Sequence, residues 1–438
     1  EGVLEKEISF ENVIVEPLRN RSHGELATNA ALVVAKLAKK NPIFIAEAIS
    51  RILSKDKKIQ FIEVVKPGFI NFGLKQSAWL HLLKDAFFQG PDFGKSNIGK
   101  GKKVNVEYVS ANPTGPLHVG HTRGAVFGDA LASLLKFTGF EVTREYYIND
   151  AGSQIDALAR SVYLRYLEIH GETVEFKGDT YPGEYLIEVA KNLQKEFQDT
   201  LVGSEETEWL SKVRTFSTNA MLELIQKDLE SLGVRMDKYY SEKDLYDSGK
   251  IELAVKSLEQ KGLIYSGTLS PPKGKTVEDY EPREQLLFKS TDYGDDVDRP
   301  IKKSDGGWTY FAPDIAYHFD KIERGFDELI DVFGADHSGY VKRMKAAVSA
   351  LSDGRVTLDV KLCQLVRLFK DGLPYKMSKR AGNFVAVSDI IEEVGFEAVD
   401  SPKAFEEAVA AAKDFEAPVT FLINRGGNYI FYALTVTS

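Results

Sequence analysis

The sequence has little cysteine, no long apolar run and no excess of positive charge, and each of these absences argues against a class of protein or partner. Its single cysteine, Cys363, excludes an internal disulfide and fits a reducing compartment. No stretch approaches the roughly 20 consecutive apolar residues of a membrane-spanning helix. No basic segment followed by an apolar one opens the sequence. We therefore expect a cytoplasmic protein without membrane contact.

The charge balance is acidic, with a formal net charge of −9 over 438 residues. A polyanionic partner needs local positive potential, so this balance argues mildly against nucleic-acid binding but allows a basic face on an acidic body. Hydrophobic residues make up 43% and charged residues 28% of the chain, as in globular enzymes. Its length predicts two to four domains. Composition therefore leaves the function open, and the sequence motifs have to indicate it.

Residues 1–95 have the pattern of a small α+β domain. Apolar spacing predicts helices over 29–37 and 46–53. Strands are predicted over 61–65 and 69–72, on either side of the turn formers Pro67 and Gly68.

A strand–loop–helix rhythm begins after this domain. It predicts a strand over 104–109, a helix over 128–136 and a strand over 141–148, and it returns with strands over 329–333 and 360–369 around a helix over 340–351. Long polar helices over 183–197 and 211–232 interrupt it. The prediction is an α/β protein with a Rossmann-type doubly wound parallel sheet, whose halves (96–160 and 291–370) are split by a connective insertion (161–290).

The segment His118-Val119-Gly120-His121 stands at a predicted strand-to-helix turn. A helix start offers unpaired backbone N–H groups and a positive dipole end, which suit a polyphosphate. Gly120 allows close approach, and both imidazoles can donate to phosphate oxygens. The alternatives are a helix cap or a zinc site. Zinc needs further ligands, and the chain's seven histidines and one cysteine lack metal spacing, so we expect no protein-bound metal.

The segment Lys376-Met377-Ser378-Lys379-Arg380 places three cations in a predicted glycine-bounded loop. Lysine ammonium groups suit a leaving pyrophosphate, and a serine hydroxyl can bind phosphate. Taken alone, such a run is typical of a solvated surface.

Together the two segments resemble the HIGH and KMSK signatures of class I aminoacyl-tRNA synthetases, in the required order. The blocks 107–117, 304–311, 314–318 and 334–340 resemble arginyl-tRNA synthetases specifically. This resemblance extends from about residue 13 to about residue 395. It implies that His118, His121, Lys376 and Lys379 are catalytic.

The resemblance also implies roles for substrate-binding residues. Glu107 and Asp314 match the acids that bind the arginine guanidinium, a planar cation suited to opposed carboxylates. Tyr310 would line the same pocket. Ser110 and Asn112 match positions near the α-amino and carboxylate groups of arginine. The resemblance implies that the remaining residues bind ATP, which would carry Mg²⁺ as Mg-ATP. They are Gly120, Asp336, His337, Val366, Met377 and Ser378.

The implied partners are L-arginine, ATP and tRNA(Arg), and we expect a monomer. The blocks 22–30 and 67–72 resemble the N-terminal domain that contacts the tRNA elbow in this family, although Phe69 and Phe72 also fit plain core packing.

The sequence departs from the family pattern at two places. Pro313 fixes φ and removes an N–H directly before Asp314, which predicts a shifted carboxylate. Residues 371–400 are expected to hold the KMSK loop and a following helix. Residues 401–438 are expected to begin a C-terminal helical region, with a helix over 401–413 but strand character after 421. The anticodon-binding domain is missing or unrecognisable there, which predicts a truncated chain.

The expected function is ATP-dependent formation of arginyl-adenylate and transfer of arginine to the 3′ end of tRNA(Arg). Two alternatives stay open. Another nucleotidyl transferase with the same histidine signature would leave the insertion and the Glu107 and Asp314 blocks unexplained. A non-catalytic tRNA-binding paralogue would be expected to carry degenerate signatures.

Overall fold

The computed structural model describes most of the chain in two compact units, Glu1–Lys95 and Ser96–Ser438. The described residues are 10, 12–18, 20–269, 284–303, 306–364, 366, 368–370, 373–375, 386–387, 390–394, 397–398, 419–425 and 428–434. Among them, no helix combines the length and apolar character needed to span a membrane. Each unit has its own hydrophobic core.

The N-terminal unit is an antiparallel sheet covered by two helices. Its strands run in the order β1 (Val15–Pro17), β2 (Leu26–Thr28), β4 (Phe69–Leu74) and β3 (Ile59–Val65). The helices α1 (Ala30–Ala38) and α2 (Pro42–Leu53) pack Val34 and Ile45 against Ile70. A third helix, α3 (Gln76–Gln89), follows β4.

Helix α2 begins earlier than predicted because its cap lies upstream of the apolar run. The Asn41 side chain accepts a hydrogen bond from the Ile43 N–H at 2.9 Å, and Pro42 occupies the first helical turn, where no N–H is needed. The helix therefore starts at Pro42 rather than at residue 46.

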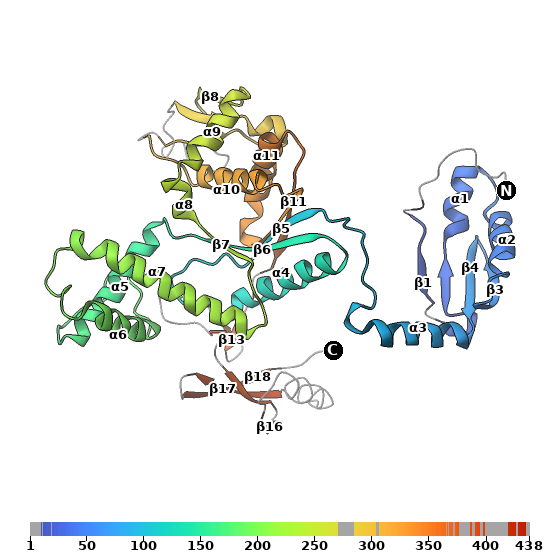
Figure 1. The fold of residues 1–438 in the computed structure, drawn as a ribbon, viewed down its shortest axis with the longest axis horizontal. Helices are drawn as coiled ribbons and strands as arrows, with labels where there is room; N and C mark the ends of the chain where they lie inside the picture. Colours follow the sequence, from blue (N-terminus) through green and yellow to red (C-terminus); the bar gives the residue numbers. More distant parts are fainter. Residues whose placement is uncertain are drawn as a thin grey trace. The chain divides into compact units, whose positions relative to one another are not determined.

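The second unit is built on a five-stranded parallel sheet in the order β12–β11–β5–β6–β7, labelled in Figure 1 except for β12. The strands are β5 (Lys103–Glu107), β6 (Glu141–Ile148), β7 (Lys238–Ser241), β11 (Glu328–Gly334) and β12 (Thr357–Cys363). From β5 the chain proceeds outward through β6 and β7, and later returns on the other side of β5 through β11 and β12. Strand order thus reverses between β5 and β11, the place where doubly wound sheets bind ligands at the carboxyl ends of their strands.

Helices cover both faces of this sheet. Leu329 packs in a core with α10 (Phe311–Glu323) and α11 (Val341–Ser352), whereas its neighbour Ile330 packs in a core with α4 (Val119–Phe137). Successive residues of β11 thus point to opposite faces. The prediction of a Rossmann-type doubly wound parallel sheet is confirmed.

Between β6 and β7 lie three helices, α5 (Ser153–Ile169), α6 (Tyr185–Phe197) and α7 (Glu206–Ser231), with a core of their own. The rings of Tyr163 and Trp209 stack there at 3.8 Å. Helices α6 and α7 lie within the expected connective insertion (161–290), whereas α5 begins before it, at Ser153. The boundaries of the insertion stay a prediction.

Further elements occur in the described part of the chain. They are η1 (Arg21–His23), η2 (Gly90–Asp92), α8 (Glu242–Asp247), α9 (Lys250–Gln260), β8 (Ile264–Gly267), β9 (Gln285–Phe288), η4 (Ser290–Tyr293), β10 (Arg299–Pro300), η5 (Ala335–Tyr340), β13 (Leu368–Lys370), β14 (Leu373–Tyr375), β15 (Ile390–Val394), β16 (Glu397–Ala398), β17 (Val419–Arg425) and β18 (Asn428–Leu434).

Two predicted strands end earlier than expected. The strand predicted over 104–109 stops at Glu107, because Val109 and Ser110 adopt φ of 70° and 39° and turn the chain away. The strand predicted over 360–369 is β12, which spans Thr357–Cys363, and residues 368–370 belong to a separate hairpin with β14. The strands predicted after residue 421 are confirmed as parts of β17 and β18, whereas the helix predicted over 401–413 lies outside the described residues.

Candidate active site at the switch point of the sheet

A strained turn follows β5 at the point where the strand order reverses. The Ser110 N–H donates to the Tyr108 carbonyl at 3.0 Å, which closes a three-residue turn around Val109 at φ 70°. A γ-turn of this hand is rare, and a β-branched residue at its centre is costly. Such strain persists only where the surroundings impose it, and it clusters at functional sites.

The two histidines of the first signature lie at the start of α4. His118 is the N-cap, and its Nδ1 accepts from the Gly120 N–H at 3.1 Å, while the His121 Nδ1 accepts from the His118 N–H at 3.2 Å. Their rings stack at 3.8 Å. Because both Nδ1 atoms accept, each neutral imidazole carries its proton on Nε2. The predicted placement on one face of a helix start is therefore confirmed, and the cap alternative is part of the same geometry.

Residues that precede and residues that follow the second signature (376–380) in the sequence contact the chain at the start of α4. Upstream, the Arg123 Nη1 donates to the Gln364 carbonyl at 2.9 Å. Downstream, Ala386 forms an antiparallel bridge with His118, and the Val387 N–H donates to the Leu117 carbonyl at 3.0 Å. The expected site residues Lys376, Met377, Ser378 and Lys379 themselves lie outside the described residues.

Asp314 lies in the first turn of α10, half-buried, and accepts a hydrogen bond from the Tyr340 hydroxyl. Burial raises its pKa to about 6, against the lowering effects of Tyr340 and His318.

The preceding Pro313 does not disturb the helix. It is the third residue of α10, where backbone N–H groups have no acceptor within the helix, so the missing donor leaves no carbonyl unpaired. The expected displacement of Asp314 by Pro313 therefore has no basis in the helix geometry.

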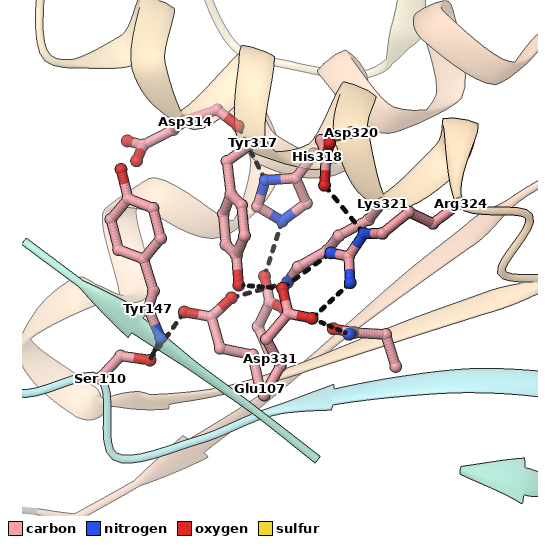
Figure 2. A network of polar contacts seen from close by, with 12 residues as sticks. Glu107, Ser110, Tyr147, Asp314, Tyr317, His318, Asp320, Lys321, Arg324 and Asp331 are labelled. Atoms are coloured by element: carbon pink, nitrogen blue, oxygen red, sulfur yellow. Dashed lines mark hydrogen bonds and ion pairs between the residues drawn. The ribbon is translucent and has the colours of Figure 1, made fainter. Parts of the chain in front are cut away.

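Glu107 is buried beneath the strained turn and already has two partners. Its Oε2 accepts from the Lys321 Nζ at 2.6 Å, and its Oε1 accepts from the Ser110 Oγ at 3.0 Å. Figure 2 shows Glu107 within a network that joins β5, α10 and β11, rather than standing alone opposite Asp314.

Glu242, which the sequence analysis missed, is a second acid whose charge interacts with that of Asp314. It is the first residue of α8, directly after the carboxyl end of β7. Burial, with the charges of Asp314 and Asp150, raises its pKa to about 7. Within the described part of the chain its Oε2 has no hydrogen-bond partner, and neither does the hydroxyl of Tyr147.

The phenol of Tyr147 lies within electrostatic range of both Asp314 and Glu242. The pKa of Tyr147 is raised well above its ordinary value by burial and then by the charges of Asp314 and Glu242. Figure 2 shows its hydroxyl pointing toward the Asp314 carboxylate. Two carboxyl groups and a phenol thus act on one another electrostatically, and the Glu242 Oε2 and the Tyr147 hydroxyl have no partner among the described residues. A cation with several N–H donors is the complementary ligand.

The structure does not bring every predicted residue to these groups. Tyr310 is 88% exposed at the N-cap of α10, where the Lys303 ammonium lies 5.6 Å from its ring centroid. The Asn112 amide donates to Gln154 Oε1 at 3.0 Å, at the start of α5.

The residues expected on the adenosine side follow the neighbouring strands. Asp336 and His337 lie in η5 directly after β11, with a 3.7 Å contact between their side chains, both more than half exposed. Val366 is partly buried after β12. No group of three potential metal ligands occurs among the residues that the structure describes.

Comparisons with known proteins identify the family of the chain. The family model for class I (R) tRNA synthetase catalytic domains matches residues 83–418, and the model for the arginyl tRNA synthetase N-terminal domain matches residues 2–74. An arginine–tRNA ligase of Ruegeria pomeroyi is 60% identical over 96% of this chain and 74% of its own length. One from Roseobacter denitrificans is 63% identical over 90% of this chain and 68% of its own length.

Solved structures give the same result for the fold. A Campylobacter jejuni chain, assigned provisionally to the arginyl-tRNA synthetases, is 39% identical, with a TM-score of 0.61 over 72% of this chain and 65% of that one. Thermus thermophilus arginyl-tRNA synthetase shares the fold, with a TM-score of 0.58 over 92% of this chain and 66% of that one. This chain thus spans about two thirds of these solved chains. It belongs to the arginyl-tRNA synthetase family, the arginine–tRNA ligases of class I.

Proposed function

We propose that this chain joins arginine to ATP as arginyl-adenylate and then transfers the arginyl group to the 3′ end of tRNA(Arg). The observation that carries the proposal is the group of Asp314, Glu242 and Tyr147, whose buried oxygens suit a guanidinium. The two histidines lie at the start of α4 in the same unit.

In this proposal the guanidinium lies between Asp314 and Glu242. Tyr340 occupies one oxygen of Asp314, which leaves the other for an N–H of the substrate. Glu107 is the weaker candidate for direct contact, because both of its oxygens already accept from the chain. Opposed acids favour a planar fork over the ammonium of lysine, and neutral citrulline would leave them uncompensated. Such polar sites reach a discrimination of ~10⁴ without editing.

The arginine carboxylate then attacks the α-phosphate of ATP, and pyrophosphate leaves with Mg²⁺ carried on its oxygens. His118 and His121 donate from Nε2 to the phosphate oxygens where negative charge develops. Lys376 and Lys379 neutralise the leaving group. Support for their approach comes from Gln364 and Ala386, the described residues on either side of this loop that contact the start of α4. No side chain acts as a nucleophile, so alignment and charge stabilisation supply the rate.

The second step needs access for the tRNA 3′ end. A cavity of about 880 Å³ is lined by Asp150, Arg214, Ser241 and Tyr246 among others. Burial and then the charges of Glu242 and Asp314 raise the pKa of Tyr246, which links this cavity electrostatically to the acids of the arginine pocket. We infer that the terminal nucleotide approaches from this side. The N-terminal unit would contact the tRNA elbow, as the resemblance implies, and the working state would be a cytoplasmic monomer.

The function is tested by ATP–pyrophosphate exchange, measured with and without tRNA(Arg). Exchange should require arginine and should be absent with lysine or citrulline. Exchange that depends on a different amino acid would move the chain to another specificity. No exchange with any amino acid, in the presence of tRNA, would favour a binding protein.

Replacing Glu242 should separate arginine binding from stability. A carboxyl group whose pKa is raised from 4.5 to about 7 binds its proton more tightly in the folded chain, so the free energy of unfolding falls as pH rises through that window. Without arginine, Glu242→Gln should therefore have a higher melting temperature than the parent at pH 8, and the difference should shrink as the pH falls toward 4.5. Its affinity for arginine at pH 8 should be lower.

The matched control is Glu259→Gln, an exposed position on α9. It should change neither quantity. An unchanged arginine affinity in Glu242→Gln would remove Glu242 from the pocket, and a lower melting temperature at pH 8 would contradict its raised pKa.

A further inference from the structure

A fully buried lysine, Lys321, lies beneath the pocket and has no role in the chemistry proposed above. We propose that Lys321 is a positioning residue for substrate arginine: it fixes the turn that carries Ser110 relative to the helix that carries Asp314. This inference rests on the proposed function and assigns to it a residue that touches neither substrate.

Ion pairs with two carboxylates stabilise the positive charge of the buried Lys321. Its side chain is 0% exposed, and its Nζ lies 2.6 Å from Glu107 Oε2 and 3.1 Å from Asp331 Oδ1. Burial opposes the charge, but Asp331, Glu107 and Glu145 raise the pKa of Lys321, so it remains an ammonium. Burial of ion pairs is a weak source of stability compared with apolar packing, so this arrangement points to a role in geometry.

The Ser110 hydroxyl connects the Lys321–Glu107 ion pair to the strained turn. Ser110 Oγ donates to Glu107 Oε1 at 3.0 Å and accepts from the Tyr147 N–H at 3.1 Å. Val109 and Ser110 both have positive φ, a conformation that costs free energy unless the surroundings enforce it. Glu107, fixed by Lys321, is the anchor that enforces it.

The same lysine belongs to α10, the helix of the guanidinium site. Asp314 lies two turns earlier on this helix, and its carbonyl contacts the His318 Nδ1 at 2.8 Å, while the His318 Nε2 contacts Asp331 at 2.9 Å. Figure 2 shows His318 of α10 in contact with Asp331 in the middle of β11, and Lys321 of α10 in contact with Glu107, the last residue of β5. Arginine has two charged ends. In this proposal the turn with Ser110 faces the α-amino and carboxylate end, as the family resemblance implies, and α10 carries Asp314 for the guanidinium. Lys321 sets the separation between them.

The test compares Lys321→Met with Lys250→Met by titration calorimetry of arginine and, separately, of a non-hydrolysable ATP analogue. Lys250 also forms ion pairs with α10, through Asp320 and Glu323, and serves as the matched control because its ion pairs among the described residues do not include Glu107. Lys321→Met should weaken arginine binding by about tenfold or more and leave the Kd for the ATP analogue within about twofold, because misplaced recognition groups lose part of their charged hydrogen bonds. Lys250→Met should leave both Kd values nearly unchanged.

A purely structural lysine would lower the melting temperature of Lys321→Met without a selective loss of arginine binding, and that result overturns the inference. If Lys321→Met yields no soluble chain, Lys321→Arg keeps the charge but changes its shape, and the same selective loss is expected; an unchanged arginine Kd overturns the inference equally. Coupling between Lys321→Met and Ser110→Ala adds a second readout, since additive effects on arginine binding would exclude action through this hydroxyl. Failure of the unsubstituted chain to bind arginine would instead contradict the proposed function.

Discussion

Replacement of Asp314 by asparagine should raise the KM for arginine by about 100-fold and leave the KM for ATP nearly unchanged. The substitution preserves size, and the Tyr340 hydroxyl can still donate to the amide oxygen. What is lost is the negative charge opposite the guanidinium, and charged hydrogen bonds contribute about 1.5–3 kcal/mol each. The measurement is arginine-dependent pyrophosphate exchange at saturating ATP.

Asp327→Asn is the control for this substitution. Asp327 lies just beyond α10, is exposed, and accepts a hydrogen bond from the Lys103 N–H at 2.8 Å, away from the carboxyl ends of the strands. Its KM for arginine should stay within about twofold of the parent, as expected for surface substitutions. If Asp314→Asn leaves arginine affinity intact, the guanidinium binds elsewhere.

Replacement of His118 by asparagine should lower kcat by about 10²–10³, the usual loss when a donor to a charged transition state is removed. Asparagine is a good N-cap, so its oxygen can replace Nδ1 as acceptor for the Gly120 N–H and α4 should keep its start. The melting temperature should therefore remain close to that of the parent.

His118→Ala separates the two roles of this residue. It removes both the imidazole and the cap, so it should show the same fall in kcat together with a loss of about 1 kcal/mol in stability. Equal kcat values for His118→Asn and the parent would mean that His118 only caps the helix.

The parallel sheet and the position of the histidines could be predicted from the sequence because both depend on local patterns. Alternating apolar residues and a glycine-containing turn specify β5 and α4 within a short segment. The end of β5 could not be predicted, since Val109 favours a strand by its own propensity and turns only under the influence of Glu107 and Ser110.

The composition of the acid pocket depends on distant contacts, which explains why the sequence identified it only in part. Glu107 and Lys321 are 214 positions apart, and no local pattern indicates that they pair. Glu242 resembles any acidic residue at a helix start, and its raised pKa arises only when the fold places it near Asp314 and Asp150. The family resemblance implies that Tyr310 lines the pocket, but α10 begins after this residue and leaves its ring exposed.

The most direct test is a crystal structure of this chain with a non-hydrolysable arginyl-adenylate analogue. The account predicts the guanidinium between Asp314 and Glu242, and the phosphate mimic within hydrogen-bond distance of the Nε2 atoms of His118 and His121. An analogue whose guanidinium binds away from Asp314 and Glu242, or whose phosphate mimic binds away from the start of α4, would contradict it.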